Sequence, residues 1–198
     1  MNAQRFIEAN TKYATNFEPI EFSGPRGRGI MIVTCMDPRV HPYEQLGLQR
    51  GECGIVRNAA GSAKDALKSL VTANYQFGCK EFAVFHHSDC RARTFTTENI
   101  RETIKKAWPG RDDIAEIVDN MHWPTFTDVE ASVKADVKFL VENPLVLPGT
   151  KISGWVYDDK TGKASVLNKH STCDCLDQSP LDFPNRRRRS SRRPDARM

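Results

Sequence analysis

The sequence lacks any hydrophobic run long enough to cross a membrane. Its 198 residues are 39% hydrophobic and 27% charged, and no apolar stretch approaches the roughly 20 residues that span a bilayer. Residues 1–17 lack the apolar core of a secretory signal and contain Glu8 with little basic character. We therefore expect a cytoplasmic protein without a membrane partner, of a length that suits one domain with a substantial core.

We also expect no disulfide framework. The chain has six cysteines, and without a secretion signal these are expected to be thiols or metal ligands. Cys53 and Cys79 lie near apolar runs and are predicted to be buried thiols. Cys173 and Cys175 lie two residues apart in a polar stretch near His170, where a second metal site is the alternative to two free thiols.

The chain carries little net charge outside its C-terminal end. Residues 171–198 hold seven Arg and four Asp, a net of +3 out of a formal net charge of +4. The few apolar residues and the arginine run at 186–193 predict a disordered, solvated Arg-rich tail over residues 171–198. Nuclear import, RNA contact and phosphorylation are the alternatives, and contact with nucleic acid is expected only through this tail.

Apolar runs and helical spacing alternate along the rest of the chain. This pattern predicts an α/β fold with a central, mainly parallel β-sheet flanked by helices and a C-terminal antiparallel hairpin. A turn over residues 158–162 would close the hairpin. The expected strands cover residues 29–35, 53–56, 81–86, 151–157 and 164–167. The expected helices cover residues 2–16, 40–47, 62–77, 97–107, 112–121 and 128–142.

Soft metal ligands follow two of the expected strands. Cys35 ends the first apolar run, and the tetrapeptide from His87 to Cys90 closes the run at 81–86. Parallel strands of an open α/β sheet bring their carboxyl ends to one edge, where ligands bind. Two thiolates and one imidazole suit zinc, and three protein ligands leave a fourth position for water or substrate.

Two charged residues beside Cys35 leave two kinds of site open. Asp37 is close enough to Cys35 to be a fourth ligand, which would make a closed structural zinc site. Alternatively, a bidentate pair with Arg39 would hold Asp37 off the metal and leave the fourth position open. His86 is expected to pack in the core, because His87, which begins the tetrapeptide ending at Cys90, is the histidine expected to bind metal.

The motifs resemble those of the β-class carbonic anhydrases. That family carries Cys-x-Asp-x-Arg, found here at residues 35–39, and His-x-x-Cys about fifty residues later, found here at residues 87–90. The flanking stretches CMDPRVHPYEQLGL, GIVRNAAG, HHSDC and ISGWVYDDKTG agree, so the resemblance covers about residues 2–168.

The resemblance implies a zinc domain over residues 1–170 that catalyses the reversible hydration of carbon dioxide to bicarbonate and a proton. It implies zinc binding by Cys35, His87 and Cys90, with Asp37 and Arg39 as catalytic residues. It also implies a homodimer or a higher even oligomer.

The chain departs from the family pattern at three positions. Arg91 stands where Gly commonly follows the second cysteine, and the backbone amide of that residue contacts substrate in the family. Ala60 stands where Gly is usual, and Pro38 removes one backbone donor near the metal. Two alternative functions stay open: a carbon disulfide or carbonyl sulfide hydrolase on the same zinc site, and a non-catalytic zinc protein that binds nucleic acid through its basic tail.

Overall fold

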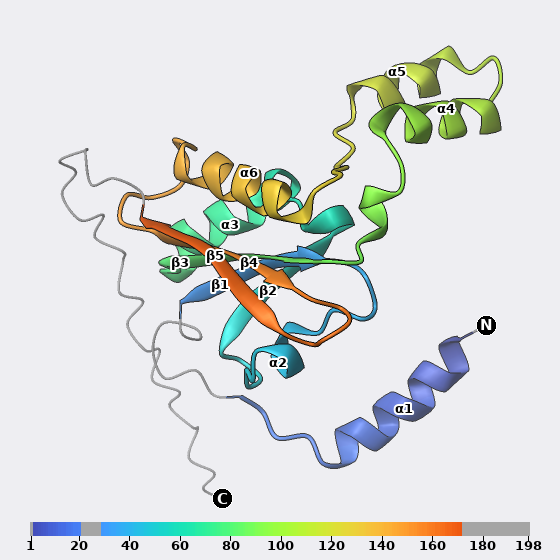
Figure 1. Ribbon diagram of the computed structural model, residues 1–198. Helices are drawn as coiled ribbons and strands as arrows, with labels where there is room; N and C mark the ends of the chain where they lie inside the picture. The colour runs from blue at the N-terminus through green and yellow to red at the C-terminus, as the bar shows by residue number, and fades with distance from the viewer. Residues whose placement is uncertain (1, 21–28, 172–198) are drawn as a thin grey trace, which may run out of the picture.

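The protein is built on one five-stranded sheet (Figure 1). The computed structural model describes residues 2–20 and 29–171. The strand order is β2-β1-β3-β4-β5, with every neighbouring pair parallel except β4 and β5, which are antiparallel. The α/β fold, the mainly parallel sheet and the C-terminal antiparallel hairpin are therefore confirmed. The strands are β1 (Ile30–Cys35), β2 (Cys53–Asn58), β3 (Glu81–His87), β4 (Lys151–Tyr157) and β5 (Ala164–Ser171).

The helices lie close to their predicted positions. Ser62 caps α3 by accepting a hydrogen bond from the Asp65 amide at 3.2 Å, and Gly78 ends that helix in a left-handed conformation. α2 is shorter than the predicted helix over residues 40–47. The helices are α1 (Ala3–Thr15), α2 (Pro42–Gln45), α3 (Ala63–Phe77), α4 (Thr97–Ala107), α5 (Asp112–Asn120) and α6 (Val129–Val141), with short 3-10 turns η1 (Ala59–Gly61) and η2 (Arg91–Arg93).

The last strand is longer than its apolar pattern suggested. We expected a strand over residues 164–167, whereas β5 continues to Ser171. Its polar second half pairs with residues 151–154 of β4, and an edge strand forms through backbone hydrogen bonds, which need no apolar side chain. Ser171, which the sequence placed at the start of the disordered tail, therefore belongs to β5. The rest of the predicted tail, with Cys173 and Cys175, lies outside the described residues, so its disorder stays a prediction.

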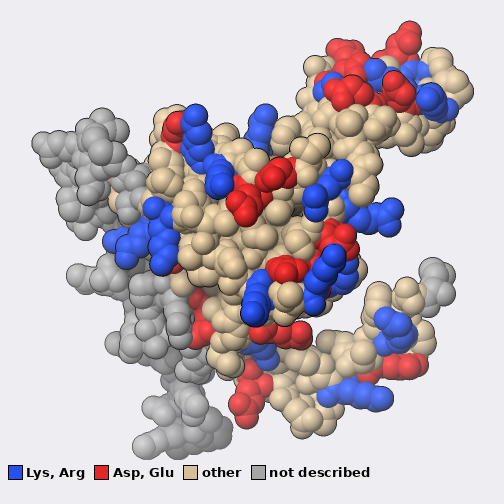
Figure 2. Space-filling model, viewed as in Figure 1, with Lys and Arg blue, Asp and Glu red and all other residues tan. Residues whose placement is uncertain are grey.

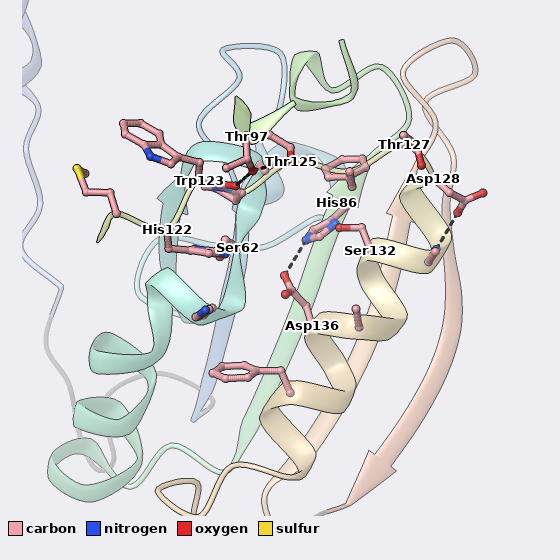
Figure 3. Close-up of a pocket in the computed structure, with 18 of the residues that line it drawn as sticks. Ser62, His86, Thr97, His122, Trp123, Thr125, Thr127, Asp128, Ser132 and Asp136 are labelled. Carbon is pink, nitrogen blue, oxygen red and sulfur yellow. Dashed lines mark hydrogen bonds and ion pairs between the residues drawn. The ribbon is translucent and has the colours of Figure 1, made fainter. Parts of the chain in front are cut away.

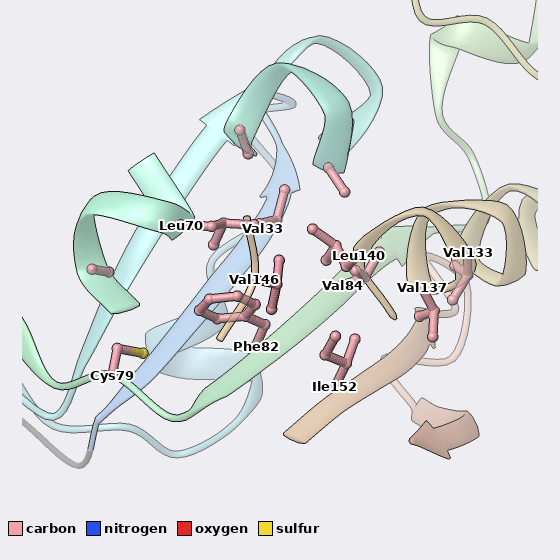
Figure 4. Packing of buried hydrophobic residues seen from close by; sticks show 13 residues of the cluster. Val33, Leu70, Cys79, Phe82, Val84, Val133, Val137, Leu140, Val146 and Ile152 are labelled. Atoms are coloured by element: carbon pink, nitrogen blue, oxygen red, sulfur yellow. The ribbon is translucent and has the colours of Figure 1, made fainter. Parts of the chain in front are cut away.

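Hydrophobic side chains cover both faces of the sheet. α3 and α6 pack on one face over a cluster that includes Phe82 and Val84 (Figure 4). Ala83 and Phe85 point to the other face, toward Val40 and the α2 region. Because β3 is buried on both faces, it is a rigid support for whatever its carboxyl end carries.

Two parts of the molecule extend from this core (Figure 1). None of the residues of α1 is buried, and the side chains of Phe6, Ile7 and Tyr13 are each more than half exposed. The α4–α5 pair carries charges of both signs (Figure 2), including a Lys105–Asp119 ion pair at 2.6 Å. Within residues 2–20 and 29–171, no helix has the length and apolar character needed to cross a membrane.

A tight backbone turn links β2 to α3 beneath the carboxyl end of β1. Ala60 has φ of 61°, a left-handed conformation that disfavours residues with a Cβ, which explains why glycine suits this position. Gly61 has φ of 73°, and a Cβ there would lie 3.0 Å from the Cys35 amide nitrogen. The turn therefore packs so closely against the end of β1 that no side chain fits at Gly61.

Reciprocal substitutions in this turn are expected to have opposite effects on stability. Ala60→Gly should relieve backbone strain and raise the free energy of unfolding by about 1 kcal/mol. Gly61→Ala should lower it by about 3 kcal/mol, because it adds both strain and a clash with β1. Urea denaturation of both variants beside the parental chain measures the difference, and a Gly61→Ala protein of parental stability would contradict this view of the turn.

Candidate metal centre

Cys35, His87 and Cys90 meet at the carboxyl edge of the sheet. Cys35 is the last residue of β1, His87 is the last residue of β3, and Cys90 follows three residues later. β1 and β3 are parallel neighbours, so both strands end at the same place. One sulfur or nitrogen atom of each residue lies within 4.8 Å of the others, and all three residues are buried. The three predicted ligands therefore form a single cluster.

The spacing of these atoms fits a tetrahedral zinc ion. The two sulfur atoms are 3.8 Å apart, which is the separation expected for two thiolates each about 2.3 Å from one tetrahedral zinc. The buried Nε2 atom of His87 has no hydrogen-bond partner among the described residues, whereas Nδ1 lies 3.0 Å from Asp159 Oδ2. An orphaned imidazole nitrogen beside two sulfurs is the donor set of a metal site.

The two thiols differ in acidity because they face each other. A hydrogen bond from Cys90 lowers the pKa of Cys35 to about 4, with His87 adding to the effect and burial opposing it. The same contact, together with burial, raises the pKa of Cys90 above its usual range. Without a cation, only one of the two sulfurs is therefore ionised at neutral pH. A divalent cation would favour the release of the second proton.

His87 is held in a setting that favours its protonated form in the absence of a metal. Burial lowers its pKa, but the Cys35 sulfur and the Asp159 carboxylate more than offset this, and the net pKa is raised. A cation would replace that proton on Nε2 while Nδ1–H stays bonded to Asp159.

Arg39 connects the two motifs. Its backbone N–H and Nε each donate to Asp37 Oδ1 at 2.9 Å, and Nη2 donates to Asp37 Oδ2 at 2.9 Å. The same guanidinium donates to Asp89 Oδ2 at 2.7 Å and to the Asp89 carbonyl at 3.0 Å. Asp37 is not among the three clustered donors. Of the two arrangements that the sequence left open, the structure has the one in which Arg39 holds Asp37.

The pair with Arg39 keeps Asp37 ionised although its side chain is only 11% exposed. Hydrogen bonds from Arg39 hold the pKa of Asp37 well below its usual range. The pKa of Asp89 is also lowered by Arg39, but its side chain is 72% exposed. Arg39 is therefore a bridge between a nearly buried carboxylate beside the metal cluster and a solvated one.

Two residues that the sequence did not single out support the cluster. Arg57 on β2 donates from Nε to the Cys35 carbonyl at 3.2 Å and from Nη2 to the Asp37 carbonyl at 2.6 Å. Asp159, in the turn after β4, contacts His87, Ser88 and Asp89. No local sequence signal identified them, because both contacts follow from the strand alignment in the structure, in which Arg57 pairs with Thr34 and Tyr157 pairs with His87.

His86 lies outside the cluster, as expected from its spacing. Its ring stacks on Phe126 at 5.8 Å between centroids, and Nε2 lies 3.1 Å from the Gly61 carbonyl and 3.4 Å from Asp136 Oδ2 (Figure 3). The surrounding cavity, of about 790 Å³, opens between α3, α6 and the loop after α5. Ala60 and Phe126 line this cavity and also pack against Cys35 and Cys90.

The remaining predicted positions are placed as follows. Cys79 is buried, as predicted, whereas Cys53, also predicted to be buried, is only half-buried because it begins β2 at the edge of the sheet. Arg91, which replaces the usual glycine, begins η2 and its side chain is exposed. An exposed side chain at this position leaves the Arg91 backbone amide beside the cluster without adding bulk inside it.

Known proteins resemble this chain over most of its length. A family model described as carbonic anhydrase matches residues 30–164. β-Carbonic anhydrase 1 of Mycobacterium tuberculosis is 30% identical over 164 residues, which cover 82% of this chain and 95% of that protein. A carbon disulfide hydrolase of Acidianus is 32% identical over 184 residues, which cover 83% of this chain and 90% of that protein.

Solved structures agree with this similarity. The crystal structure of a carbonic anhydrase from Streptococcus mutans superimposes with a TM-score of 0.75 at 35% identity, covering 85% of this chain and 98% of that one. The matched family region contains both the strands that carry the cluster and the cluster itself. The chain therefore belongs to the β-class carbonic anhydrase family.

Proposed function

We propose that this protein is a zinc-dependent carbonic anhydrase that reversibly hydrates carbon dioxide to bicarbonate and a proton. The observation that carries the proposal is the ionised Asp37, held by Arg39 beside three metal donors rather than among them. Three donors leave one tetrahedral position, as in catalytic zinc sites, whereas a structural site is closed by a fourth protein ligand. The similarity to the mycobacterial β-carbonic anhydrase supports the same activity.

The residues around the cluster have separate roles in this chemistry. Zinc held by the cluster would supply the Lewis acidity that makes water nucleophilic near neutral pH. Asp37 Oδ1 already accepts two hydrogen bonds from Arg39, whereas Oδ2 accepts one from the described residues. Oδ2 therefore keeps a lone pair with which to accept a hydrogen bond from the attacking water and orient it toward carbon dioxide.

An apolar surface for carbon dioxide lies beside the thiols. Ala60, Ala92 and Phe126 pack around Cys35 and Cys90. Carbon dioxide has no charge and no hydrogen-bond donor, so an apolar wall suits it better than it suits bicarbonate. These side chains would therefore offer the uncharged gas a suitable surface beside the thiols.

The metal prediction concerns zinc content. The parental chain should contain about one zinc ion, and Cys35→Ser or Cys90→Ser should lose most of it, because one of three ligands is removed. Cys53→Ser is the matched control, since Cys53 lies outside the cluster. Plasma emission spectrometry of gel-filtered protein gives the ratio of zinc to chain. Full occupancy in either ligand variant would show that the ligand assignment is wrong.

The activity prediction concerns the Arg39–Asp37 pair. Arg39→Ala frees Asp37 to occupy the fourth position, so carbon dioxide hydration should fall by roughly 100-fold while zinc is retained. Arg39→Lys should restore only part of the rate, because an ammonium group cannot make the two-pronged contact. Stopped-flow hydration assays, with zinc content measured beside each, test both variants.

A surface pair of the same geometry is the control for that assay. Arg111 donates from Nε and Nη2 to Asp113 at 2.8 and 2.6 Å, at the N-terminus of α5. Arg111→Ala removes an equivalent fork away from the cluster and should leave the rate unchanged. If Arg39→Ala also keeps the parental rate, then Arg39 and Asp37 are only a structural pair.

A second candidate substrate class follows from the Acidianus relative, a carbon disulfide hydrolase as similar to this chain as the mycobacterial protein is. Carbon disulfide and carbonyl sulfide are linear electrophiles like carbon dioxide, so the same cluster could attack them. Sulfide release and carbon dioxide hydration measured on one preparation separate the two activities. Sulfide release without hydration would assign the site to the hydrolase reaction.

The exposed apolar side chains of α1 favour an oligomer. Phe6 and Tyr13 are seven residues apart, so they share one face of the helix, and they are 58% and 52% exposed. Light scattering should give at least twice the chain mass of 22.4 kDa. Replacing both with Asp should shift the protein toward monomer, whereas Asp at Gln4 and Thr11, on the opposite face, should not. A parental monomer with full activity would contradict the expected dimer.

A further inference from the structure

Asp159 is a buried carboxylate that contacts three consecutive residues of the second metal motif. Its side chain is only 7% exposed. Oδ2 lies 3.0 Å from His87 Nδ1, accepts the Ser88 hydroxyl at 3.2 Å and accepts the Asp89 backbone N–H at 2.7 Å. In return, the backbone N–H of Asp159 donates to the Ser88 hydroxyl at 3.0 Å.

The sheet topology places Asp159 at this position. β3 and β4 are parallel, and His87 is aligned with Tyr157, so both strands reach the carboxyl edge together. The chain then turns over residues 158–162 into β5, and Asp159 is the second residue beyond β4. A residue at this place in the turn overhangs the end of β3, which explains its contact with residues 87–89.

The turn itself does not need Asp159. Asp158, its neighbour, accepts the Lys160 backbone N–H at 2.9 Å and the Thr161 hydroxyl at 2.8 Å. Asp158 therefore stabilises the turn, while Asp159 is directed away from it toward β3. A buried carboxylate is costly unless it is hydrogen-bonded, and the donors that satisfy Asp159 belong to the metal-binding segment.

We propose that Asp159 is a positioning residue of the metal centre, which holds His87 in the tautomer that presents Nε2 to the metal and so sets the affinity for zinc. A carboxylate that accepts Nδ1–H fixes the ring orientation and makes the other nitrogen a better donor. The inference rests on the proposed function only in taking the cluster to hold zinc. It does not depend on which substrate is used.

Asp159 also connects the ligand to the Arg39 bridge. Asp159 accepts a hydrogen bond from the backbone N–H of Asp89. Asp89 in turn accepts hydrogen bonds from the Arg39 guanidinium through both its carboxylate and its backbone carbonyl. Loss of Asp159 would therefore loosen His87 directly and Arg39 indirectly. The direct effect is on metal affinity, which separates this role from that of Asp37.

Zinc affinity of the full chain tests the proposal. Titration against a chromophoric zinc chelator at pH 7.5 gives the dissociation constant for the parental chain, Asp159→Asn, Asp159→Ala and the control Asp158→Asn. Asp159→Ala should bind zinc roughly 10–100-fold more weakly. Asp159→Asn should lie between it and the parental chain, because an amide oxygen keeps the hydrogen bond without the charge. Asp158→Asn should match the parental value.

A second measurement separates positioning from loss of fold. In zinc-loaded protein labelled with ¹⁵N-histidine, the His87 Nδ1–H proton should resonate downfield, as expected for a hydrogen bond to a carboxylate. Asp159→Asn should move this resonance upfield, and Asp158→Asn should leave it in place. A purely structural role for Asp159 would change thermal stability without moving this resonance.

The outcomes are distinct. Unchanged zinc affinity and an unchanged resonance in Asp159→Asn overturn the proposal and leave the proposed function intact. A parental chain that binds no zinc overturns both. Should Asp159→Ala fail to fold, Asp159→Asn keeps the side-chain shape and gives the decisive comparison.

Discussion

The parallel pairing of β1 with β3 is the constraint on which the site depends. These strands are neighbours in the middle of the sheet and end at the same edge, which brings together Cys35 from one and His87 from the other. The hydrophobic side chains of β3 that point alternately to α3 and α6 or toward α2 hold it in place. A slip in this register would separate the sulfur of Cys35 from the imidazole of His87. The geometry of the metal centre therefore depends on the packing of the core.

Charge is the second constraint at this edge. Two thiols, Asp37, Asp89 and Asp159 gather there, the described cations that contact this edge include Arg39, Arg57 and Arg93, and the pKa of His87 is raised in the absence of a metal. The hydrogen bond with Cys35 and burial raise the pKa of Cys90, so the second thiol resists ionisation beside the first. A divalent cation bound by both sulfur atoms would favour the ionisation of both thiols. The paired thiols at this edge are therefore suited to binding a cation.

Much of this arrangement was readable from the sequence, for definite physical reasons. Apolar runs and helix caps are local signals, so the strands, the limits of α3 and the clustering of three donor side chains at strand ends could be predicted. The pairing of Asp37 with Arg39 was one of two options, the other being Asp37 as a fourth metal ligand. Both partners are close to Asp37, so the sequence alone does not determine which one its carboxylate binds. The polar half of β5 gave no apolar signal, and its backbone pairing with β4 became visible only in the structure.

Arg57 and Asp159 show where sequence reasoning stops. Both touch the cluster only because a neighbouring strand is aligned in a particular register, and each sits in a stretch that reads as an ordinary strand end or turn. Neighbouring Asp158 and Asp159 have the same chemistry but different tasks: one caps a turn through local bonds, and the other reaches across to β3. Local sequence cannot distinguish them, because the difference lies in which direction the chain faces when it leaves β4. The residue that supports His87 is therefore determined by the alignment of the strands, whereas His87 itself can be recognised from its sequence motif.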